Sequence, residues 1–246
     1  MLRFGDFYYI CEMKKFALIG HPVAGSLSPV LFKAAYGGRY AYDLIDDEEF
    51  SGAWARGLEY DGFNVTAPYK RDAARMCEGC GLDAVNLVIP SVEGCKGYNT
   101  DIDGVVGALG DVAPDAIALI VGTGGAASAA YAALERLGCR IVIAGRSLEK
   151  ARAVGDAWYT DLSGLGDVCA DIVVYTLPGR VPVPDGLRTE NAVVLEAEYR
   201  TPRLEGCSCG RYISGKQWLL HQGIAAYRIF TGEEPDVEAM LKAFVG

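Results

Sequence analysis

The sequence lacks the features of several large classes of protein. Basic residues are outnumbered, with 23 Lys and Arg against 32 Asp and Glu and a formal net charge of -9 at pH 7. Because nucleic-acid binding requires a basic face, we expect no nucleic-acid partner, although a local positive pocket for a small anion is compatible with this charge. No apolar run reaches the roughly 18 residues of a membrane helix, so we expect no membrane partner either.

Signals for export and for histidine chemistry are also missing. The N-terminus shows no apolar segment followed by a small-residue cleavage site, and we therefore expect a cytoplasmic protein. The sequence has only two histidines, and neither belongs to a catalytic motif. We expect His21 in a loop or lining a pocket, and His221 on a helix surface. Because the segment from Met13 resembles a natural protein start, we interpret the first 12 residues as an extension or a misplaced start.

The eight cysteines raise the alternative of a metal site. Cys77 and Cys80 have the spacing of metal ligands, and Cys207 and Cys209 form a distant second pair. A structural zinc site needs four ligands that converge from short loops. Reduced thiols are the default in an intracellular α/β enzyme. We therefore predict no metal site.

The alternation of short apolar strands with helices predicts an α/β fold whose mainly parallel sheet is covered on both faces. In the first part we expect strands over 16–19, 40–45 and 63–66, a strand pair over 84–89 and 94–98, and helices from Ser28, as N-cap, and over 48–58. A helix from Asp103 and a polar connector over 111–115 precede a second series. That series consists of strands 117–121, 140–144, 172–176 and 192–195, with helices 126–137 and 148–154, and helices 218–230 and 237–244 end the chain.

The strand over 63–66 ends in a polar tip, Ala67-Pro68-Tyr69-Lys70. In an open α/β sheet, ligands bind beyond the carboxyl ends of the strands. A lysine at that place can act as an acid or base if its pKa is lowered. Taken alone, Lys70 is more simply interpreted as a solvated turn residue, because most lysines are exposed.

The segment Gly122-Thr123-Gly124-Gly125-Ala126-Ala127 separates a predicted strand from an alanine-rich helix. Glycine at the first position permits a tight turn, and the next two glycines let the backbone approach a pyrophosphate. The exposed amides at the start of the helix then bind the anion. This context favours a dinucleotide site over the alternative, a tight turn without a ligand.

The end of the next strand indicates which dinucleotide binds. An NAD site places an acidic residue there to accept from the ribose 2′-hydroxyl. This sequence has Arg146 and Ser147 instead, with Lys150 one helical turn later. A cation and a hydroxyl suit a 2′-phosphate, so NADP(H) is favoured over NAD. The alternative is that Arg146 only ends the strand and pairs with Glu149.

Taken in order, these motifs resemble the shikimate dehydrogenase family along nearly the whole length from Lys14. They are Ile19-Gly20-His21-Pro22, Ser26-Leu27-Ser28-Pro29, Gly62–Lys70, Ala84-Val85-Asn86, Gly97-Tyr98-Asn99-Thr100-Asp101, the glycine loop, Arg146-Ser147, Thr201-Pro202, and Gln222 with Gly232. The resemblance implies an N-terminal substrate domain, 1–103 plus 218–246, and a Rossmann-like NADP-binding domain, 104–217, which face a cleft.

The resemblance also implies the reversible, NADP-dependent reduction of 3-dehydroshikimate to shikimate, a step of chorismate and aromatic amino-acid biosynthesis. By that likeness Lys70 and Asp101 form the catalytic pair, and Ser26 and Ser28 bind the substrate carboxylate. Thr66, Asn86 and Gln222 bind its hydroxyls. The residues implied for NADP(H) are Gly122, Thr123, Gly124, Gly125, Ala126, Arg146, Ser147, Lys150 and Thr176. Helix capping is the alternative for the two serines, and backbone capping for Asn86 and Gln222.

The sequence departs from the family pattern at several positions. Glu196 stands where the family has a tyrosine, and we expect its carboxylate to face away from the substrate or to be paired, since it would repel an anion. The other departures are Asp83, Ile102, Tyr175 and Trp218. They leave open a paralogue that acts on quinate or a related polyol acid and, in another class, a non-catalytic sensor of shikimate-like acids. We expect a monomer or a homodimer.

Overall fold

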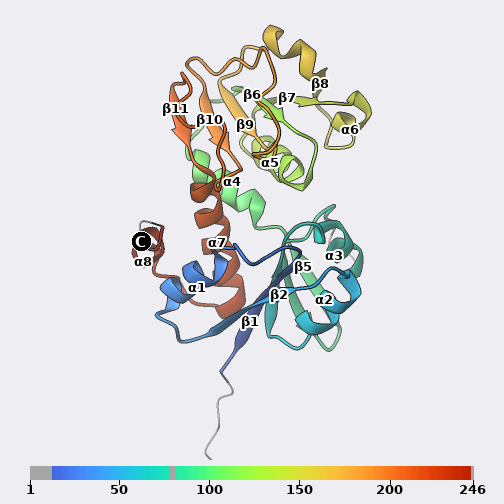
Figure 1. The fold of residues 1–246 in the computed structure, drawn as a ribbon, viewed down its shortest axis with the longest axis vertical. Coiled ribbons are helices and arrows are strands. Elements are labelled where there is room, and N and C mark those ends of the chain that lie inside the picture. Colours follow the sequence, from blue (N-terminus) through green and yellow to red (C-terminus); the bar gives the residue numbers. More distant parts are fainter. Residues whose placement is uncertain (1–12, 78–80, 245–246) are drawn as a thin grey trace, which may run out of the picture.

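The structure is a computed structural model that describes residues 13–77 and 81–244. The chain folds into two α/β domains, each built on its own sheet, which follow one another along the long axis of the molecule (Figure 1). The predicted alternation of strands and helices is confirmed. The interpretation of the first 12 residues concerns a segment outside the described residues. Within the described ranges, no helix combines the length and the apolar character needed to cross a bilayer.

The first sheet has the order β2-β1-β3-β4-β5. Its strands are β1 (Lys15–Gly20), β2 (Ala41–Asp46), β3 (Gly62–Val65), β4 (Leu87–Ser91) and β5 (Gly94–Tyr98). The first three are parallel, whereas β4 and β5 form an antiparallel hairpin at one edge. The sheet is accompanied by α1 (Ser28–Tyr36), α2 (Phe50–Gly57) and α3 (Lys70–Met76), of which α3 was not predicted. The N-cap of α1 is Leu27, so the prediction that Ser28 is the cap is wrong by one residue.

The second sheet is parallel throughout, in the order β11-β10-β9-β6-β7-β8. Its strands are β6 (Ile117–Val121), β7 (Arg140–Gly145), β8 (Trp158–Asp161), β9 (Ile172–Tyr175), β10 (Val193–Glu196) and β11 (Arg211–Ile213), with α4 (Asp101–Leu109), α5 (Gly125–Arg136), α6 (Leu148–Arg152) and the 3₁₀ helix η1 (Leu162–Asp167). Strand order reverses at β6, which has β9 on one side and β7 on the other. Such a reversal opens a crevice at the carboxyl ends of the strands.

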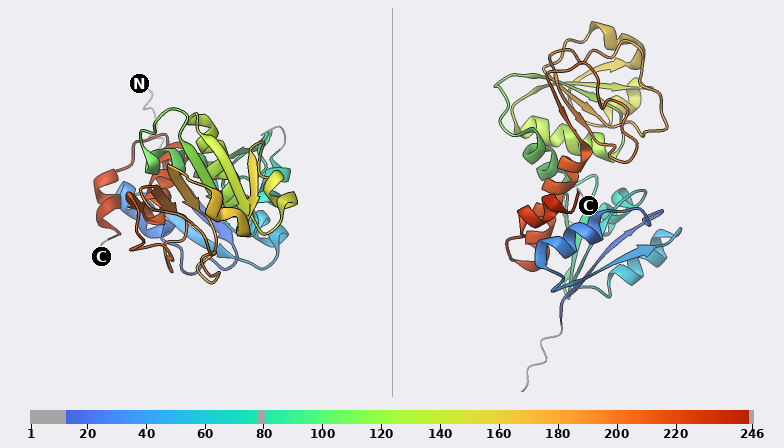
Figure 2. Two further views of the ribbon diagram at one scale, coloured as in Figure 1. Left: turned by 90° about the horizontal axis from the view of Figure 1, so that it is seen from above. Right: turned by 60° about the vertical axis from the view of Figure 1, so that its left-hand side comes forward.

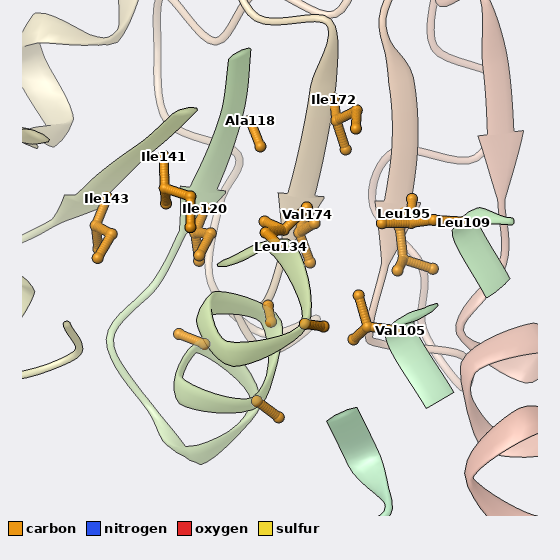
Figure 3. Close-up of a cluster of buried hydrophobic side chains, with 14 of the residues drawn as sticks. Val105, Leu109, Ala118, Ile120, Leu134, Ile141, Ile143, Ile172, Val174 and Leu195 are labelled. Atoms are coloured by element: carbon orange, nitrogen blue, oxygen red, sulfur yellow. The ribbon is translucent and has the colours of Figure 1, made fainter. Parts of the chain in front are cut away.

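The core beneath this sheet is apolar. Figure 3 shows Ile120 and Val174 on the sheet facing Leu134 of α5, with Val105 of α4 beside them. Four alanines of α5 are buried, namely Ala127, Ala129, Ala130 and Ala133, and their short side chains let this helix lie close to the strands. The start of α5 is thereby fixed at the carboxyl end of β6.

The helix α7 (Gly215–Thr231) joins the two domains, and α8 (Val237–Lys242) follows it. Figure 2 shows α7, in red, between the two sheets. Its residue Trp218 belongs to the core of the second domain, whereas Tyr227 and Phe230 belong to the core of the first. Phe230 stacks on Phe16 of β1 with ring centroids 4.7 Å apart. A single helix therefore completes both cores.

Close packing of α4 against α7 depends on glycine. A Cβ atom on Gly104 would lie 2.6 Å from Cδ1 of Trp218, and one on Gly107 would lie 2.5 Å from Nδ1 of His221. Both distances are too short for a side chain. The two helices therefore meet at van der Waals distance, and the position of α7 is set by α4.

Candidate active site

A cleft of about 280 Å³ lies between the two domains. The first domain lines it with Ser26, Ser28, Asn64, Thr66, Lys70, Asn86 and Asp101, the second with Ala126, Ala197, Tyr199 and Arg200, and α7 with Trp218, Leu219 and Gln222. All seven residues predicted to act as the catalytic pair or to bind substrate line this one cleft.

Lys70 and Asp101 lie at the first positions of α3 and α4. Their side chains form an ion pair in which the Lys70 ammonium donates to Oδ2 of Asp101. The side chains are 24% and 14% exposed, so both are largely shielded while still bordering the cleft. The Asp101 backbone is held by Trp218, whose Nε1 donates to its carbonyl over 3.0 Å. The arrangement presents a proton donor of fixed orientation to any ligand in the cleft.

Three buried polar side chains meet beside this pair. The Thr100 amide donates to Oδ1 of Asn86 over 2.8 Å, and Nδ2 of Asn86 donates to Oγ1 of Thr100 over 3.0 Å. Gln222 of α7 approaches both, with its Oε1 3.5 Å from Nδ2 of Asn86 and 3.4 Å from Oγ1 of Thr100. All three are less than 10% exposed. The network holds side-chain amides at the cleft wall, where they can bind hydroxyl groups.

Ser26 lies on the loop before α1, and Ser28 is the first residue of that helix. Their Oγ atoms are 3.1 Å apart, and the Ser28 amide donates to Oγ of Ser26 over 3.2 Å. Tyr227 of α7 donates to the Ser28 carbonyl over 3.1 Å. The capping alternative for these serines is thus partly met, because Ser26 accepts an amide at the start of α1. Both side chains nevertheless border the cleft.

Asn64 and Thr100 are site residues to which the sequence alone assigned no role. Asn64 lies within the fully buried strand β3, donates to the Asn86 carbonyl over 3.0 Å and accepts from the Tyr42 hydroxyl over 2.8 Å. In the sequence, Asn64 could have been singled out as an amide side chain within a predicted buried strand. Thr100 could have been singled out by its position next to Asp101. Both residues hold Asn86 in place. Asn64 bonds to the backbone carbonyl of Asn86, and Thr100 bonds to the side chain of Asn86.

The glycine loop joins β6 to α5, as predicted. Gly122 has φ of 126°, and a Cβ atom there would lie 2.2 Å from Oγ1 of Thr176, which donates to the Val121 carbonyl over 2.9 Å. Only glycine suits this position. A Cβ atom on Gly124 or Gly125 would meet no described heavy atom within 4 Å, so the backbone is open in front of the helix start. This open cradle at a helix N-terminus fits a pyrophosphate.

Arg146 and Ser147 follow β7 directly. The Ser147 hydroxyl accepts the Lys150 amide over 3.4 Å and so caps α6. Arg146 is exposed and forms no ion pair with any residue that the structure describes, so the alternative in which it pairs with Glu149 is wrong. A cation without a carboxylate partner at this strand end fits the 2′-phosphate of NADP.

Glu196 is fully buried and faces away from the cleft. Its carboxylate accepts from the Arg203 amide over 2.6 Å, from the Leu204 amide over 3.0 Å and from the Tyr212 hydroxyl over 2.8 Å. Burial and this carboxylate raise the pKa of Tyr212 above its ordinary value, which keeps the hydroxyl a neutral donor. The expectation that Glu196 faces away from the substrate or is paired is confirmed, because its carboxylate is hydrogen-bonded and does not line the cleft.

Neither histidine lines the cleft. His21 lies on a loop with its Nδ1 2.7 Å from Oδ1 of Asp46, and His221 is half-buried against α4 rather than on an open helix surface. Burial lowers the pKa of His221.

The described cysteines that were weighed as metal ligands lie in two separate cores. Cys77 belongs to a core of the first domain, whereas Cys207 and Cys209 pack on a core of the second. Cys80 falls outside the described residues. Within the described ranges, no three His, Cys, Asp or Glu side chains are grouped as metal ligands.

Known proteins share both the sequence pattern and the fold. Residues 18–88 match the model of the shikimate dehydrogenase substrate binding domain, and residues 219–243 that of the shikimate 5′-dehydrogenase C-terminal domain. The chain is 30% identical to a shikimate dehydrogenase (NADP(+)) of Archaeoglobus fulgidus, over 92% of this chain and 96% of the relative. The two family models cover the cleft residues from Ser26 to Asn86 together with Leu219 and Gln222 of α7, whereas Asp101 and Trp218 lie outside the matched ranges.

Two solved structures have the same fold. Mycobacterium tuberculosis shikimate dehydrogenase superposes with a TM-score of 0.83 at 32% identity, over 94% of this chain and 99% of that one. A quinate dehydrogenase from Corynebacterium glutamicum, in complex with NAD, superposes with a TM-score of 0.80 at 26% identity, over 95% and 99%. The two-domain architecture is thus shared by enzymes named for two different acids.

Proposed function

This chain belongs to the shikimate dehydrogenase family, and from that premise we propose that it is an NADP-dependent oxidoreductase that reversibly reduces 3-dehydroshikimate to shikimate, for chorismate and aromatic amino-acid biosynthesis. The observation that carries the proposal is the Lys70–Asp101 ion pair in the cleft between the domains. It lies in the same cleft as two serines and a cluster of buried amides, which suits a polyol carboxylate. The substrate is a small molecule.

Different cleft residues are assigned to different chemical groups of such a substrate. We assign Ser26 and Ser28 to the carboxylate, because two neighbouring hydroxyls at the start of a helix can donate to an anion. Thr66, Asn86 and Gln222 are assigned to the ring hydroxyls. The buried network around Thr100 restricts the rotation of Asn86 and Gln222. Preorganised donors of this kind lose little entropy when the substrate binds.

The chemical step needs a proton donor. NADPH, when bound, supplies the hydride that the ring carbonyl accepts. Negative charge then develops on the carbonyl oxygen, and the Lys70 ammonium stabilises it and donates a proton from Nζ. Asp101 fixes the direction of Nζ through their ion pair. In the reverse direction the neutral amine accepts the proton of the same hydroxyl.

The cofactor is assigned to the second domain. The pyrophosphate and nicotinamide side would be held by Gly122, Thr123, Gly124, Gly125, Ala126 and Thr176, and the 2′-phosphate by Arg146, Ser147 and Lys150. This division supports the predicted domain bounds of 1–103 plus 218–246 and 104–217, because the first sheet ends at Tyr98 and the second runs from Ile117 to Ile213. The monomer or homodimer state and the cytoplasmic location stay predictions.

Replacing Arg146 by alanine tests the cofactor assignment. We expect kcat/KM for NADPH to fall about 10- to 100-fold, because a hydrogen bond to a charged group contributes about 1.5–3 kcal/mol. The value for NADH, which lacks the 2′-phosphate, should change less than twofold. Initial rates with both cofactors give the comparison, and Arg136→Ala, on an exposed helix face, is the control. Equal losses with NADPH and NADH would contradict the assignment.

One assay separates the proposed function from its alternatives. Absorbance of NADPH and NADH is followed with shikimate and with quinate. We expect turnover with shikimate and NADP, and a lower kcat/KM for the other three combinations. The structural likeness to a quinate dehydrogenase makes the second acid a necessary arm. A preference for quinate or NAD would favour the paralogue, and no turnover in any combination would favour the sensor.

A further inference from the structure

The two serines assigned to the substrate carboxylate carry no positive charge, so another residue would have to supply one. On the proposed function, the substrate is an anion that leaves water when it enters a cleft, and a buried carboxylate is costly unless it meets a positive or strongly donating partner. Ser26 and Ser28 are neutral. Among the described residues that line the cleft, Lys70 and Arg200 carry the positive charges, and Lys70 is already paired with Asp101.

Arg200 reaches the serine loop from the opposite domain. It lies in the segment after β10, whereas the serine loop follows β1. A Cβ atom on Gly25 would lie 3.2 Å from Cζ, 3.2 Å from Nη2 and 3.3 Å from Nη1 of Arg200. Three atoms at nearly equal distance mean that the guanidinium lies flat against Gly25. Because Gly25 directly precedes Ser26, the guanidinium borders the part of the cleft assigned to the carboxylate.

The guanidinium has no carboxylate partner of its own. Across the part of the chain that the structure describes, Arg200 appears in no ion pair, and its recorded aromatic contact is with the Tyr199 ring, 5.7 Å away. Glu198 accepts the Arg200 backbone amide over 2.8 Å instead of meeting the guanidinium. An arginine presents two parallel donors that match a carboxylate.

Hydrogen bonds to two carboxylates hold the backbone of the segment that carries Arg200. The buried Glu196 carboxylate accepts the amides of Arg203 and Leu204, which lie just beyond Arg200. Glu198 accepts the amides at 200 and, over 3.4 Å, at 201. Two carboxylates therefore fix the backbone on both sides of Arg200, while its side chain extends into the cleft.

We propose that Arg200 is a specificity-determining residue that binds the substrate carboxylate across the cleft from Ser26 and Ser28. The acid is then held from both domains at once, with the hydroxyls of one domain and the guanidinium of the other. The inference rests on the proposed function and adds to it that the second domain selects for a carboxylate, in addition to holding the cofactor. Glycine at position 25 permits this close approach, since a Cβ atom there would lie 3.2 Å from the guanidinium and would require it to shift by a few tenths of an ångström.

The test compares shikimate with its uncharged methyl ester in the NADP-linked assay. We expect wild-type protein to prefer the acid, and Arg200→Ala to raise KM for shikimate about 10- to 100-fold while changing KM for the ester less than threefold. Arg200→Lys keeps the charge but loses the paired donors, and should give an intermediate KM. Arg203→Ala is the matched control, because this exposed arginine lies on the same segment and does not line the cleft.

The outcomes distinguish a failure of the role inferred for Arg200 from a failure of the proposed function. Active wild-type protein whose KM for shikimate stays within twofold in Arg200→Ala overturns the inference and leaves the proposed function intact. An equal rise in KM for acid and ester also overturns it, because that pattern indicates a general change in cleft shape. Wild-type protein that turns over neither shikimate nor quinate contradicts the proposed function itself, and the role of Arg200 falls with it.

Discussion

Replacing Lys70 by alanine is expected to lower kcat about 10²- to 10⁴-fold, the usual contribution of a positioned general acid. The loss arises because the developing alkoxide would have to take its proton from water. KM for shikimate should change little, since Ser26, Ser28 and the buried amides remain. The fold should also remain, because the Lys70 side chain lies at the surface of the cleft and belongs to no apolar core. Steady-state kinetics and a urea denaturation curve measure both effects.

Two companion variants sharpen this experiment. Asp101→Asn should lower kcat as well, and the double variant should lose much less than the product of the single losses, because the two side chains act as a pair. Lys96→Ala is the control, because Lys96 is exposed on β5 and lies outside the cleft. A kcat for Lys70→Ala within twofold of wild type would refute the proposed mechanism.

Replacing Glu196 by alanine is expected to lower the free energy of unfolding by about 3–5 kcal/mol. The carboxylate accepts three hydrogen bonds in a fully buried position, and each donor left without an acceptor costs about 1–3 kcal/mol. Domains have a total stability of about 5–15 kcal/mol, so this change removes a large part of it. Urea denaturation followed by circular dichroism measures the loss.

A milder variant distinguishes loss of hydrogen bonds from loss of packing. Glu196→Gln keeps the shape and one acceptor oxygen, and should cost about 1–2 kcal/mol. Glu190→Ala, on an exposed residue before β10, should cost less than about 0.5 kcal/mol. Because Glu196 faces away from the cleft, KM for shikimate should not change in Glu196→Gln. A strong tightening of shikimate binding would show that the carboxylate faces the substrate after all.

The elements with strong apolar periods were predictable from the sequence, and the weakly patterned ones were not. The buried strands β6, β7 and β9 consist of apolar runs bounded by glycine or polar residues. By contrast α3 buries only Ala73 within its own length and is rich in charge, so it carries no helical period. The edge strands β8 and β11 are short and partly exposed, and their pairing depends on a neighbouring strand already in place.

The site shows the same division. Lys70 and Asp101 were identified because each lies in a distinctive local motif, although by composition alone Lys70 resembled a solvated turn residue. Arg200 directly precedes the Thr201-Pro202 motif but is not part of it, and its proposed role depends on its contact with Gly25 of the other domain. Asn64 was missed because its role also depends on a contact between distant segments. Its side-chain amide forms a hydrogen bond to the Asn86 carbonyl only once β3 and β4 have paired. Contacts between segments far apart in the sequence are therefore what the sequence alone left undetermined.

The division of α7 between two cores has a consequence for how the chain is made. Trp218 completes the core of the second domain and Phe230 that of the first, where it stacks on Phe16 near the start of the chain. During synthesis the N-terminal domain therefore emerges from the ribosome without the helix that covers its aromatic face. That face stays open until α7 has been synthesised. The first domain can therefore complete its fold only after all the strands of the second domain have been made.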